Sequence, residues 1–341
     1  MCFRLIIKSY DFACKYLEND IMHKPIEKFS QMYYKIQLDD FNQFIKKIEF
    51  IMYHSRLIED LYLEFATISD NSVKINNEIA NMLNKEYKQI ILTYFNSNNI
   101  KDISSKTEFQ IDINENYSIK FLNHNNTLLL SLNEYNLTKR DYMINKQDKE
   151  LNSILINYLF YLMELDKNQE QKFSVIDPLC NTGKLIIECS FFNKDMAINV
   201  RNRLNFPVFK LFGHICENIV LKNHNNYTGI VNDNQDFKCF RENVNFTNQK
   251  IKISKYDLDW LDVKFKKGDL DYCISYLKSD LDKKKVKEFF YQAEFITKKT
   301  IGIISDFKID EKILKKYSLK TKIFDEIIVF DSTYYIYIIV H

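Results

Sequence analysis

The chain has 341 residues, of which 46% are hydrophobic and 28% are charged, a balance that indicates a globular protein of two or three domains. Glycine and proline are scarce, at 5 and 3 residues, which excludes collagen-like, proline-rich and glycine-rich architectures and any G-x-G-x-x-G nucleotide loop. The net charge of +2 says nothing about partners, because a nucleic-acid-binding protein needs its basic residues gathered on one face.

The cysteines and the apolar stretches exclude further classes. None of the 7 cysteines forms a C-x-x-C pair, so the sequence predicts neither a zinc site nor a redox dithiol, and no metal is expected. No secretory signal is recognisable, so reduced thiols and a cytoplasmic location are expected. No apolar stretch approaches the roughly 18 residues of a membrane-spanning helix, so no membrane partner is expected.

The N-terminal half predicts two small units of mixed structure. Residues 1–65 begin with a strand-like run, continue with a helix over 11–21, and carry apolar residues at helical spacing over 40–65, with an interruption near His54. In residues 66–145 a helix over 76–96 precedes three alternating runs, FQIDI, YSIKFL and TLLLSL, which predict strands. An amphipathic helix over 147–166 is expected within a connecting segment, 146–170.

The C-terminal half, residues 171–341, alternates between strands and helices. Runs such as FSVI, YTGIV, DYCISYL and TIGIISD predict strands, and helical patterns follow them. Repeated alternation of this kind predicts a doubly wound, mostly parallel sheet. The last two strands are joined only by residues 331–333, which is too short for a helical crossover, so they must be antiparallel neighbours.

A parallel sheet that ends in an antiparallel hairpin is the arrangement of the class I, S-adenosylmethionine-dependent methyltransferases. The segment 177–188, DPLCNTGKLIIE, follows the first strand of this sheet and resembles the D-P-x-C-G-S-G-T-x-x-I-E loop of the THUMP-domain RNA guanine-N2 methyltransferases, which modify tRNA or rRNA. The resemblance implies that Asp177 accepts a hydrogen bond from the methionine ammonium of S-adenosylmethionine. It also implies that Cys180, Asn181 and Gly183 form the tight turn beside this cofactor. An ordinary strand-to-helix turn with an aspartate cap is the alternative.

The resemblance extends upstream of that loop. Residues 130–142, LSLNEYNLTKRDY, resemble the end of the THUMP domain, and HSRLI at 54–58 resembles the small ferredoxin-like domain of the same enzymes. The implied fold is a Rossmann-like α/β methyltransferase domain preceded by α+β ferredoxin-like and THUMP-like units. Lys139, Arg140 and Tyr142 are then candidates for contacts with RNA, through phosphates and base stacking. For a Lys-Arg pair, an ordinary solvated surface is the alternative.

The sequence departs from this family at the second and third cofactor contacts. The spacing from Gly229 to Asn243 places Val231 where the family has an acid that holds the ribose hydroxyls. Asp233 is the candidate substitute, although it is equally suited to be the N-cap of the following helix. Asp257 is the candidate for the adenine amine, with Asp259 as an alternative.

The fourth strand lacks the N-P-P-Y motif with which the family holds the target amine. Ser275 and Tyr276 are the candidate catalytic residues there, although two hydroxyls do not reproduce the amide and carbonyl acceptors of that motif. Two functions follow. The first is methyl transfer from S-adenosylmethionine to a guanine N2 in tRNA or rRNA. The second is a catalytically degenerate paralogue that serves as an RNA-binding or partner subunit.

Overall fold

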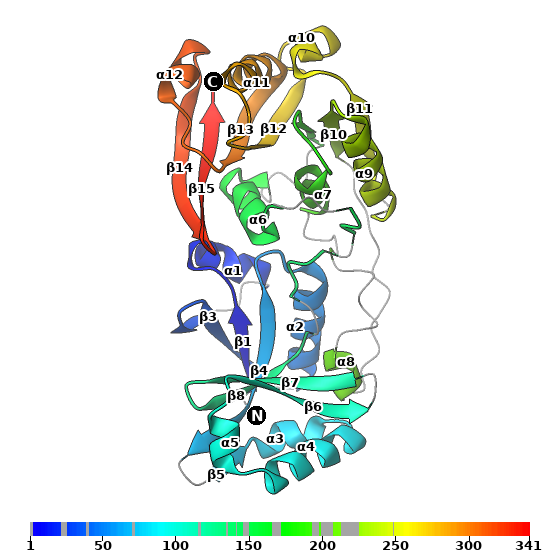
Figure 1. Cartoon of the computed structure of the whole chain (residues 1–341), viewed down its shortest axis with the longest axis vertical. Coiled ribbons are helices and arrows are strands. Elements are labelled where there is room, and N and C mark those ends of the chain that lie inside the picture. Colours follow the sequence, from blue (N-terminus) through cyan, green and yellow to red (C-terminus); the bar gives the residue numbers. More distant parts are fainter. Residues whose placement is uncertain are drawn as a thin grey trace. The chain divides into compact units, whose positions relative to one another are not determined.

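The computed structural model describes residues 3–21, 26–38, 41–69, 72–114, 117–133, 136–140, 142–145, 150–165, 172–192, 198, 207–212, 225–247 and 249–341. The chain divides into two compact units, which Figure 1 shows in the colours of the sequence. The first unit is formed by Met1–Lys139 and Ile198–Ile219, and the second by Arg140–Ala197 and Val220–His341.

The first unit is built on one antiparallel sheet. Its described elements are β1 Phe3–Lys8, η1 Asp11–Ala13, α1 Cys14–Asp20, β2 Glu27–Ser30, β3 Tyr33–Leu38, α2 Phe41–His54, β4 Asp60–Ser69, β5 Ser72–Ile75, α3 Asn77–Met82, α4 Lys85–Ser97, α5 Ile100–Ser104, β6 Glu108–Asn114, β7 Tyr117–His124, β8 Thr127–Ser131 and α8 Pro207–Phe212. The strand order is β2-β3-β1-β4-β8-β7-β6, and β5 pairs with β4. The boundary expected between residues 65 and 66 therefore falls inside a strand, β4.

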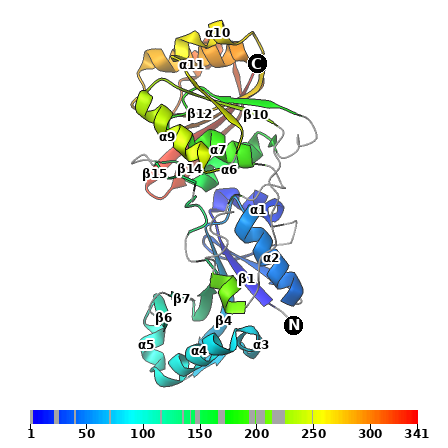
Figure 2. The same ribbon diagram turned by 90° about the vertical axis from the view of Figure 1, so that its right-hand side faces the viewer.

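Asparagine side chains begin three helices of this unit. Asn76, Asn84 and Asn99 each accept a hydrogen bond from a backbone N–H in the first turn of α3, α4 and α5. These bonds satisfy donors that have no partner within the helix. Figures 1 and 2 show α3, α4 and α5 as one group beside β6 and β7. Phe95 of α4 packs on Phe121 of β7, with ring centroids 5.6 Å apart, and this contact anchors the helix to the sheet.

The helix expected over 40–65 is correct only for its first half. The structure has α2 up to His54 and then the strand β4, in which Leu61, Leu63 and Phe65 are buried and the residues between them are not. That period of two belongs to a strand. The apolar spacing alone suited both structures, and pairing of β4 with β1 and β8 decides between them.

The second unit contains the expected doubly wound sheet. Its described elements are α6 Ser153–Leu162, β9 Ser174–Asp177, α7 Lys184–Phe191, β10 Asn226–Val231, α9 Asn234–Asn245, β11 Ile251–Lys255, η4 Leu258–Trp260, α10 Leu261–Lys264, β12 Leu270–Leu277, α11 Lys283–Ile296, β13 Thr297–Ser305, α12 Glu311–Lys316, β14 Lys320–Val329 and β15 Ser332–Val340. The sheet order is β11-β10-β9-β12-β13-β15-β14. The first five strands are parallel, and β15 is antiparallel to both of its neighbours, as the short closing connection predicted.

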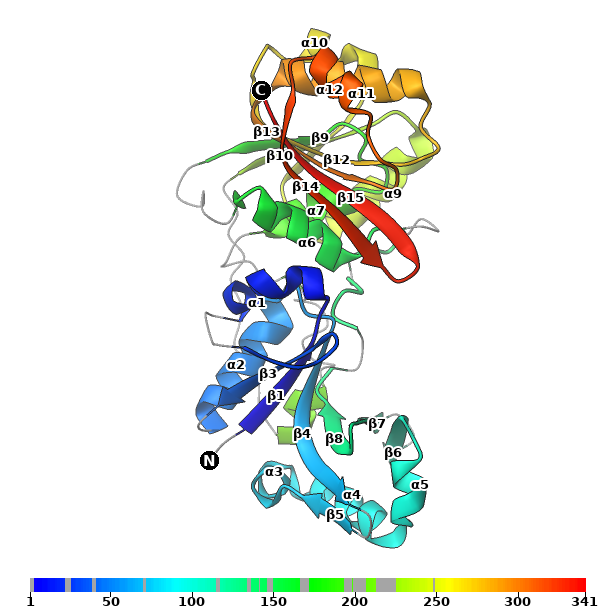
Figure 3. The same cartoon turned by 90° about the vertical axis from the view of Figure 1, so that its left-hand side faces the viewer.

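Helices cover both faces of this sheet. Figure 3 shows α10, α11 and α12 on one face and α6 and α7 on the other. The helix α6 was expected to be amphipathic, but all ten of its residues are buried, so the structure corrects that expectation. On the opposite face, Phe289 and Phe290 of α11 lie in one apolar cluster with Ile301 and Ile303 of β13. Burial on both faces explains why the strands are nearly continuous apolar runs.

Candidate functional site

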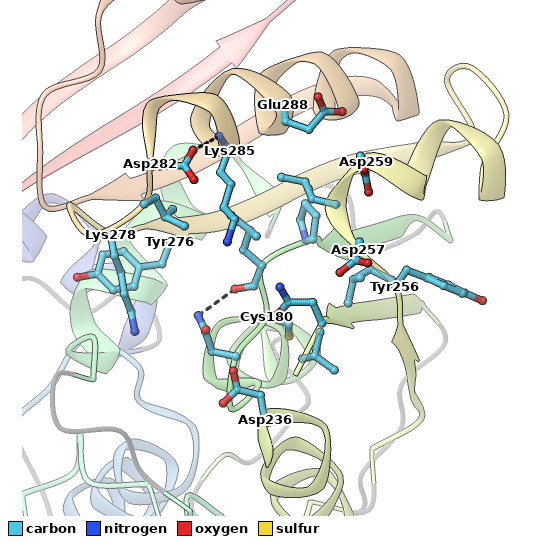
Figure 4. Close-up of a pocket in the computed structure, with 18 of the residues that line it drawn as sticks. Cys180, Asp236, Tyr256, Asp257, Asp259, Tyr276, Lys278, Asp282, Lys285 and Glu288 are labelled. Carbon is cyan, nitrogen blue, oxygen red and sulfur yellow. Dashed lines mark hydrogen bonds between the residues drawn. The ribbon is translucent and has the colours of Figure 1, made fainter. Parts of the chain in front are cut away.

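A cleft of about 570 Å³ opens at the carboxyl ends of β9, β10, β11 and β12 (Figure 4). Its walls are the loops that follow these strands and the first turns of α9 and α11. Chain order reverses at β9, since β10 lies on one side of it and β12 on the other. In open α/β sheets the crevice at such a switch point is where ligands bind, and the volume suits a small molecule.

The loop after β9 forms one wall, and it contains two predicted cofactor residues, Cys180 and Asn181. Asn181 has a φ of 45°, a left-handed conformation that asparagine tolerates better than most residues, and its side chain donates to the Leu179 carbonyl at 3.0 Å. Gly183 also has a positive φ and begins α7. A Cβ there would lie 2.1 Å from the ring of Phe240, so the close approach of α9 requires glycine.

Asp177 lies behind this loop rather than in the cleft. The residue is 1% exposed, and its Oδ1 accepts from the Leu179 N–H at 3.1 Å and from the Ser275 hydroxyl at 3.2 Å. Burial raises the pKa of Asp177 to about 7, an effect that these donors and the Cys180 thiol only partly offset. The structure therefore corrects the expected direct contact with a ligand ammonium, because this carboxyl shapes the loop from below.

The end of β10 presents Val231 to the cleft, as the interval from Gly229 predicted. Asp233 is exposed, and its carboxylate accepts from the N–H groups of Gln235 and Asp236 as the N-cap of α9. It does not line the cleft, so its prediction as a cofactor residue is corrected in favour of the cap. Asp236, in the first turn of α9, does line the cleft. Sequence reasoning missed this residue, although its place three positions after a capping Asp was the available signal.

The opposite wall carries the third predicted contact. Asp257 and Asp259 both line the cleft where β11 ends, so the two alternatives from the sequence lie together (Figure 4). Further carboxylates come from Asp280, Asp282 and Glu288, against three lysines at 278, 284 and 285. Acidic groups thus outnumber basic ones, and such a cleft favours a cationic ligand.

The two predicted catalytic residues have different environments. Ser275 is fully buried and donates to Asp177, so its prediction as a residue that contacts substrate is corrected. Tyr276 lines the cleft, and its hydroxyl donates to Oδ2 of Asp306 at 3.3 Å. Neighbouring residues of a strand point to opposite faces of the sheet. The end of β12 therefore presents only one of these two hydroxyl-bearing side chains to the cleft.

Two of the three predicted RNA contacts are internal. Arg140 and Tyr142 are 4% and 2% exposed, and both bind the buried carboxylate of Glu188 on α7. Neither side chain is available to RNA, so these two predictions are corrected, whereas Lys139 is exposed. Sequence reasoning did not recognise Glu188 as their partner. The signal was an acid inside an otherwise apolar helical run, since a buried charge requires partners.

Asn243 fastens the segment after Tyr142 to the loop after β9. Its Nδ2 donates to the carbonyls of Asn145 and Thr182, at 3.1 and 3.0 Å, and its Oδ1 accepts from the N–H groups of Ile144 and Asn145. All four bonds are made by a side chain with no exposed surface. The interval from Gly229 identified this residue, but only the structure gives its role.

Comparisons with known proteins place this geometry among methyltransferase folds. No protein-family model matches the sequence, and neither does any curated protein. A possible methylase from Clostridium difficile 630 is similar over 99% of this chain and 98% of its own, with 16% identity and a TM-score of 0.66. SMU.472, a candidate methyltransferase complexed with SAH (S-adenosylhomocysteine), is similar over 99% of this chain and 97% of its own, with 12% identity and a TM-score of 0.63. TrmN from Thermus thermophilus covers 99% of both chains, with 10% identity and a TM-score of 0.59.

These likenesses show the fold: the second unit has the Rossmann-like α/β fold found in methyltransferases, and the first unit is α+β. Among the described helices, none is long and apolar enough to cross a membrane. In the same part of the chain, no group of three or more His, Cys, Asp or Glu side chains could hold a metal ion.

Proposed function

We propose that the second unit binds S-adenosylmethionine in the cleft and that the protein transfers its methyl group to an RNA. The observation that carries this proposal is the open cleft at the switch point of the sheet. Beside it lies a loop in which Asn181 and Gly183 adopt left-handed backbone conformations. The acidic excess of the lining suits a cofactor that carries a sulfonium and an ammonium group. Val231 and Tyr276 line the cleft without filling it.

The residues present fit such a cofactor in three places. The backbone at Cys180 and Asn181 would approach its methionine part, and Asp257 or Asp259 would accept from the adenine amine. Asp236 is the acid placed to accept from the ribose hydroxyls, because Val231 has no acceptor. When bound, the cofactor supplies a methyl group on an already reactive sulfonium, so the protein's own contribution is positioning.

The finer assignment, to a guanine N2 in tRNA or rRNA, rests on the resemblance of 177–188 and 130–142 to the THUMP-domain enzymes. The extent of the structural likeness supports it, because all three solved structures are matched over 99% of this chain and so include the first unit. Lys139 is the one predicted RNA contact that is exposed.

A non-catalytic role in RNA binding is the second candidate. The observation in its favour is the end of β12, where the N-P-P-Y motif is absent and the Ser275 hydroxyl is bonded to the buried Asp177. Methyl transfer to an amine needs acceptors that orient the nitrogen lone pair, and this strand supplies none of the usual ones.

Isothermal titration calorimetry with S-adenosylmethionine and with SAH tests the binding half of the proposal. We expect the wild type to bind both, and Asp257→Asn and Asp236→Asn each to weaken binding about tenfold, the effect of one lost hydrogen bond to a charged acceptor. Asp269→Asn is the matched control, since Asp269 is exposed and outside the cleft. Absence of binding by the wild type would remove the enzymatic function.

The transfer half is tested with cellular small RNA, the protein and S-adenosylmethionine labelled in the methyl group. The products are digested to nucleosides and separated by mass. A rise in N2-methylguanosine supports the finer assignment, and another methylated nucleoside supports transfer to RNA but a different target. Cofactor binding without any labelled nucleoside favours the non-catalytic role.

A further inference from the structure

The cleft wall at the end of β12 contains Tyr276, a side chain that no part of the proposed cofactor site uses and that is bonded to a carboxylate outside the cleft lining. Tyr276 lines the cleft at the same end as Lys278 (Figure 4), and its hydroxyl donates to Oδ2 of Asp306, the residue after β13. The Ser279 hydroxyl donates to the same oxygen at 3.3 Å, and the Asp306 N–H donates to the Leu277 carbonyl. The carboxylate is thus held beside the segment that replaces the N-P-P-Y motif.

The other carboxylate oxygen, Oδ1 of Asp306, is buried and receives no hydrogen bond in the part of the chain that the structure describes. A buried acceptor without a donor is rare in folded proteins and calls for an explanation. The Tyr276 oxygen also retains acceptor capacity, because a phenol that donates one hydrogen bond can accept another. Both contacts to Oδ2 are long, at 3.3 Å, and bonds at catalytic sites often shorten only when substrate is present.

The other polar groups at this end of the cleft are less suited to accept from an amine. Lys278 has only donors. The Asp282 carboxylate accepts from the Lys285 N–H at 2.7 Å and caps α11. Asp280 is exposed, so water competes for its oxygens. Tyr276 is therefore the acceptor that combines a place in the cleft wall with a carboxylate behind it.

We propose that Tyr276 and Asp306 form a proton relay that takes the place of the missing amine acceptors, and that the target nitrogen is the 2-amino group of a guanine. This inference rests on the proposed function. The target N–H donates to the Tyr276 oxygen. As the nitrogen bonds to the methyl carbon and the carbon–sulfur bond breaks, its proton passes to Tyr276 and the tyrosine proton passes to Asp306. The sulfur leaves as a neutral thioether, so charge and atoms balance.

Ligand pairs that differ only in the amine test this relay without turnover. With the cleft saturated by SAH, binding of guanosine and of inosine, which lacks the 2-amino group, is measured on the full chain. We expect the wild type to bind guanosine about tenfold more tightly than inosine. Guanosine can donate one more hydrogen bond, to a hydroxyl that is itself bonded to a carboxylate. Tyr276→Phe and Asp306→Asn should remove most of this preference while SAH affinity stays unchanged.

Tyr291 and Asp262 provide a matched control pair. The Tyr291 hydroxyl donates to Asp262 at 3.1 Å, neither residue lines the cleft, and Tyr291→Phe and Asp262→Asn should leave the guanosine preference intact. Asp280→Asn tests the competing acceptor in the same wall. In single-turnover transfer to RNA, we expect a loss of about 100-fold or more for the two relay variants.

The outcomes separate this inference from the proposed function. A wild type that fails to bind SAH contradicts both. A wild type that binds SAH but does not distinguish the two nucleosides overturns the relay alone, as does a preference that survives in Tyr276→Phe. If Asp306→Asn loses SAH binding through misfolding, the conservative Tyr276→Phe variant decides the matter. Loss of preference in Asp280→Asn instead would assign the acceptor to that residue.

Discussion

Two carboxylates in the second unit are almost completely buried, and their surroundings give them opposite behaviour. Glu188 is bound by the Arg140 guanidinium at 2.8 Å, the Tyr142 hydroxyl at 2.6 Å and the Asn157 amide at 2.8 Å. Burial alone would raise its pKa, but Arg140 and these hydrogen bonds outweigh burial and hold the pKa below its ordinary value. Glu188 is therefore a charged structural centre.

Asp177 has no cationic partner among the described residues. Its contacts are a backbone N–H, the Ser275 hydroxyl and the Cys180 thiol, and burial raises its pKa to about 7. The comparison shows that burial alone does not determine whether an acid is charged, because the groups that contact the carboxylate set its pKa. One carboxylate joins the segment at Arg140 to the domain at any ordinary pH, and the other titrates near neutrality beneath the candidate cofactor loop.

The largest expected effect comes from removing the cation that binds Glu188. Arg140→Met leaves the Glu188 carboxylate buried without its cation, and we expect a loss of roughly 3–5 kcal/mol in the free energy of unfolding. Urea denaturation at pH 7 measures it. Lys315→Met is the control, because its pair with Glu311 is exposed and should contribute little. An equal, small change in both variants would contradict the buried centre.

The second effect concerns the pH dependence of Asp177. The pKa of this carboxyl is raised in the folded protein, so the folded state binds more protons than the unfolded state between about pH 4 and 7. Stability should fall as pH rises through this window, by roughly 2–4 kcal/mol from this group. The difference between wild type and Asp177→Asn in urea titrations from pH 4.5 to 8 isolates it. A difference independent of pH would refute the raised pKa.

A smaller effect tests one hydrogen bond of the Glu188 centre. Tyr142→Phe removes a hydroxyl that donates to a buried charge, and we expect a loss of about 2 kcal/mol in the free energy of unfolding. Tyr291→Phe provides the comparison, since its bond to Asp262 lies at the surface. If the two variants lost equal stability, the Tyr142 hydroxyl would not be supporting a buried carboxylate.

The smallest expected effect concerns the hydrogen bond from Ser275 to Asp177. Ser275→Ala should cost about 1 kcal/mol in unfolding free energy, because it removes one hydrogen bond to the Asp177 carboxyl. The Ser275 hydroxyl lowers the pKa of Asp177, so the variant should also shift the pH-dependent loss of stability toward higher pH. Chemical shifts of a ¹³C-labelled Asp177 carboxyl measure that pKa directly, and a downward shift would speak against the bond.

Much of the second unit could be predicted from local patterns. The alternation of strands and helices gave its parallel sheet, and the three-residue connection before β15 gave the antiparallel hairpin. The loop at Asn181 and Gly183 was located by the resemblance of residues 177–188 to the THUMP-domain enzymes, and the left-handed backbone angles at both residues suit the asparagine and the glycine found there. The cleft beside it followed from the general behaviour of parallel sheets.

The site residues that sequence reasoning misplaced share one physical cause. Asp233 was expected to hold the cofactor, and Arg140 and Tyr142 were expected to contact RNA. All three are polar residues, and polarity does not reveal the direction of a side chain. Asp233 turns to cap α9 through N–H groups two and three positions away, which is the alternative that the sequence offered. Arg140, in contrast, turns inward to Glu188, 48 positions along the chain. Ser275 turns to Asp177, 98 positions away. No local pattern contains such distant partners.

The sequence by itself determined the fold of the second unit, because hydrophobic period is a property of neighbouring residues, and the resemblance of residues 177–188 to a known family located the loop beside the cleft. The tertiary structure decided which polar groups face the cleft and which face the core. It placed Asp236 and Tyr276 at the cleft, and it gave Glu188 a cation that Asp177 lacks. These outcomes depend on burial and on partners from distant strands, which set the charge and direction of each side chain only after the chain has folded.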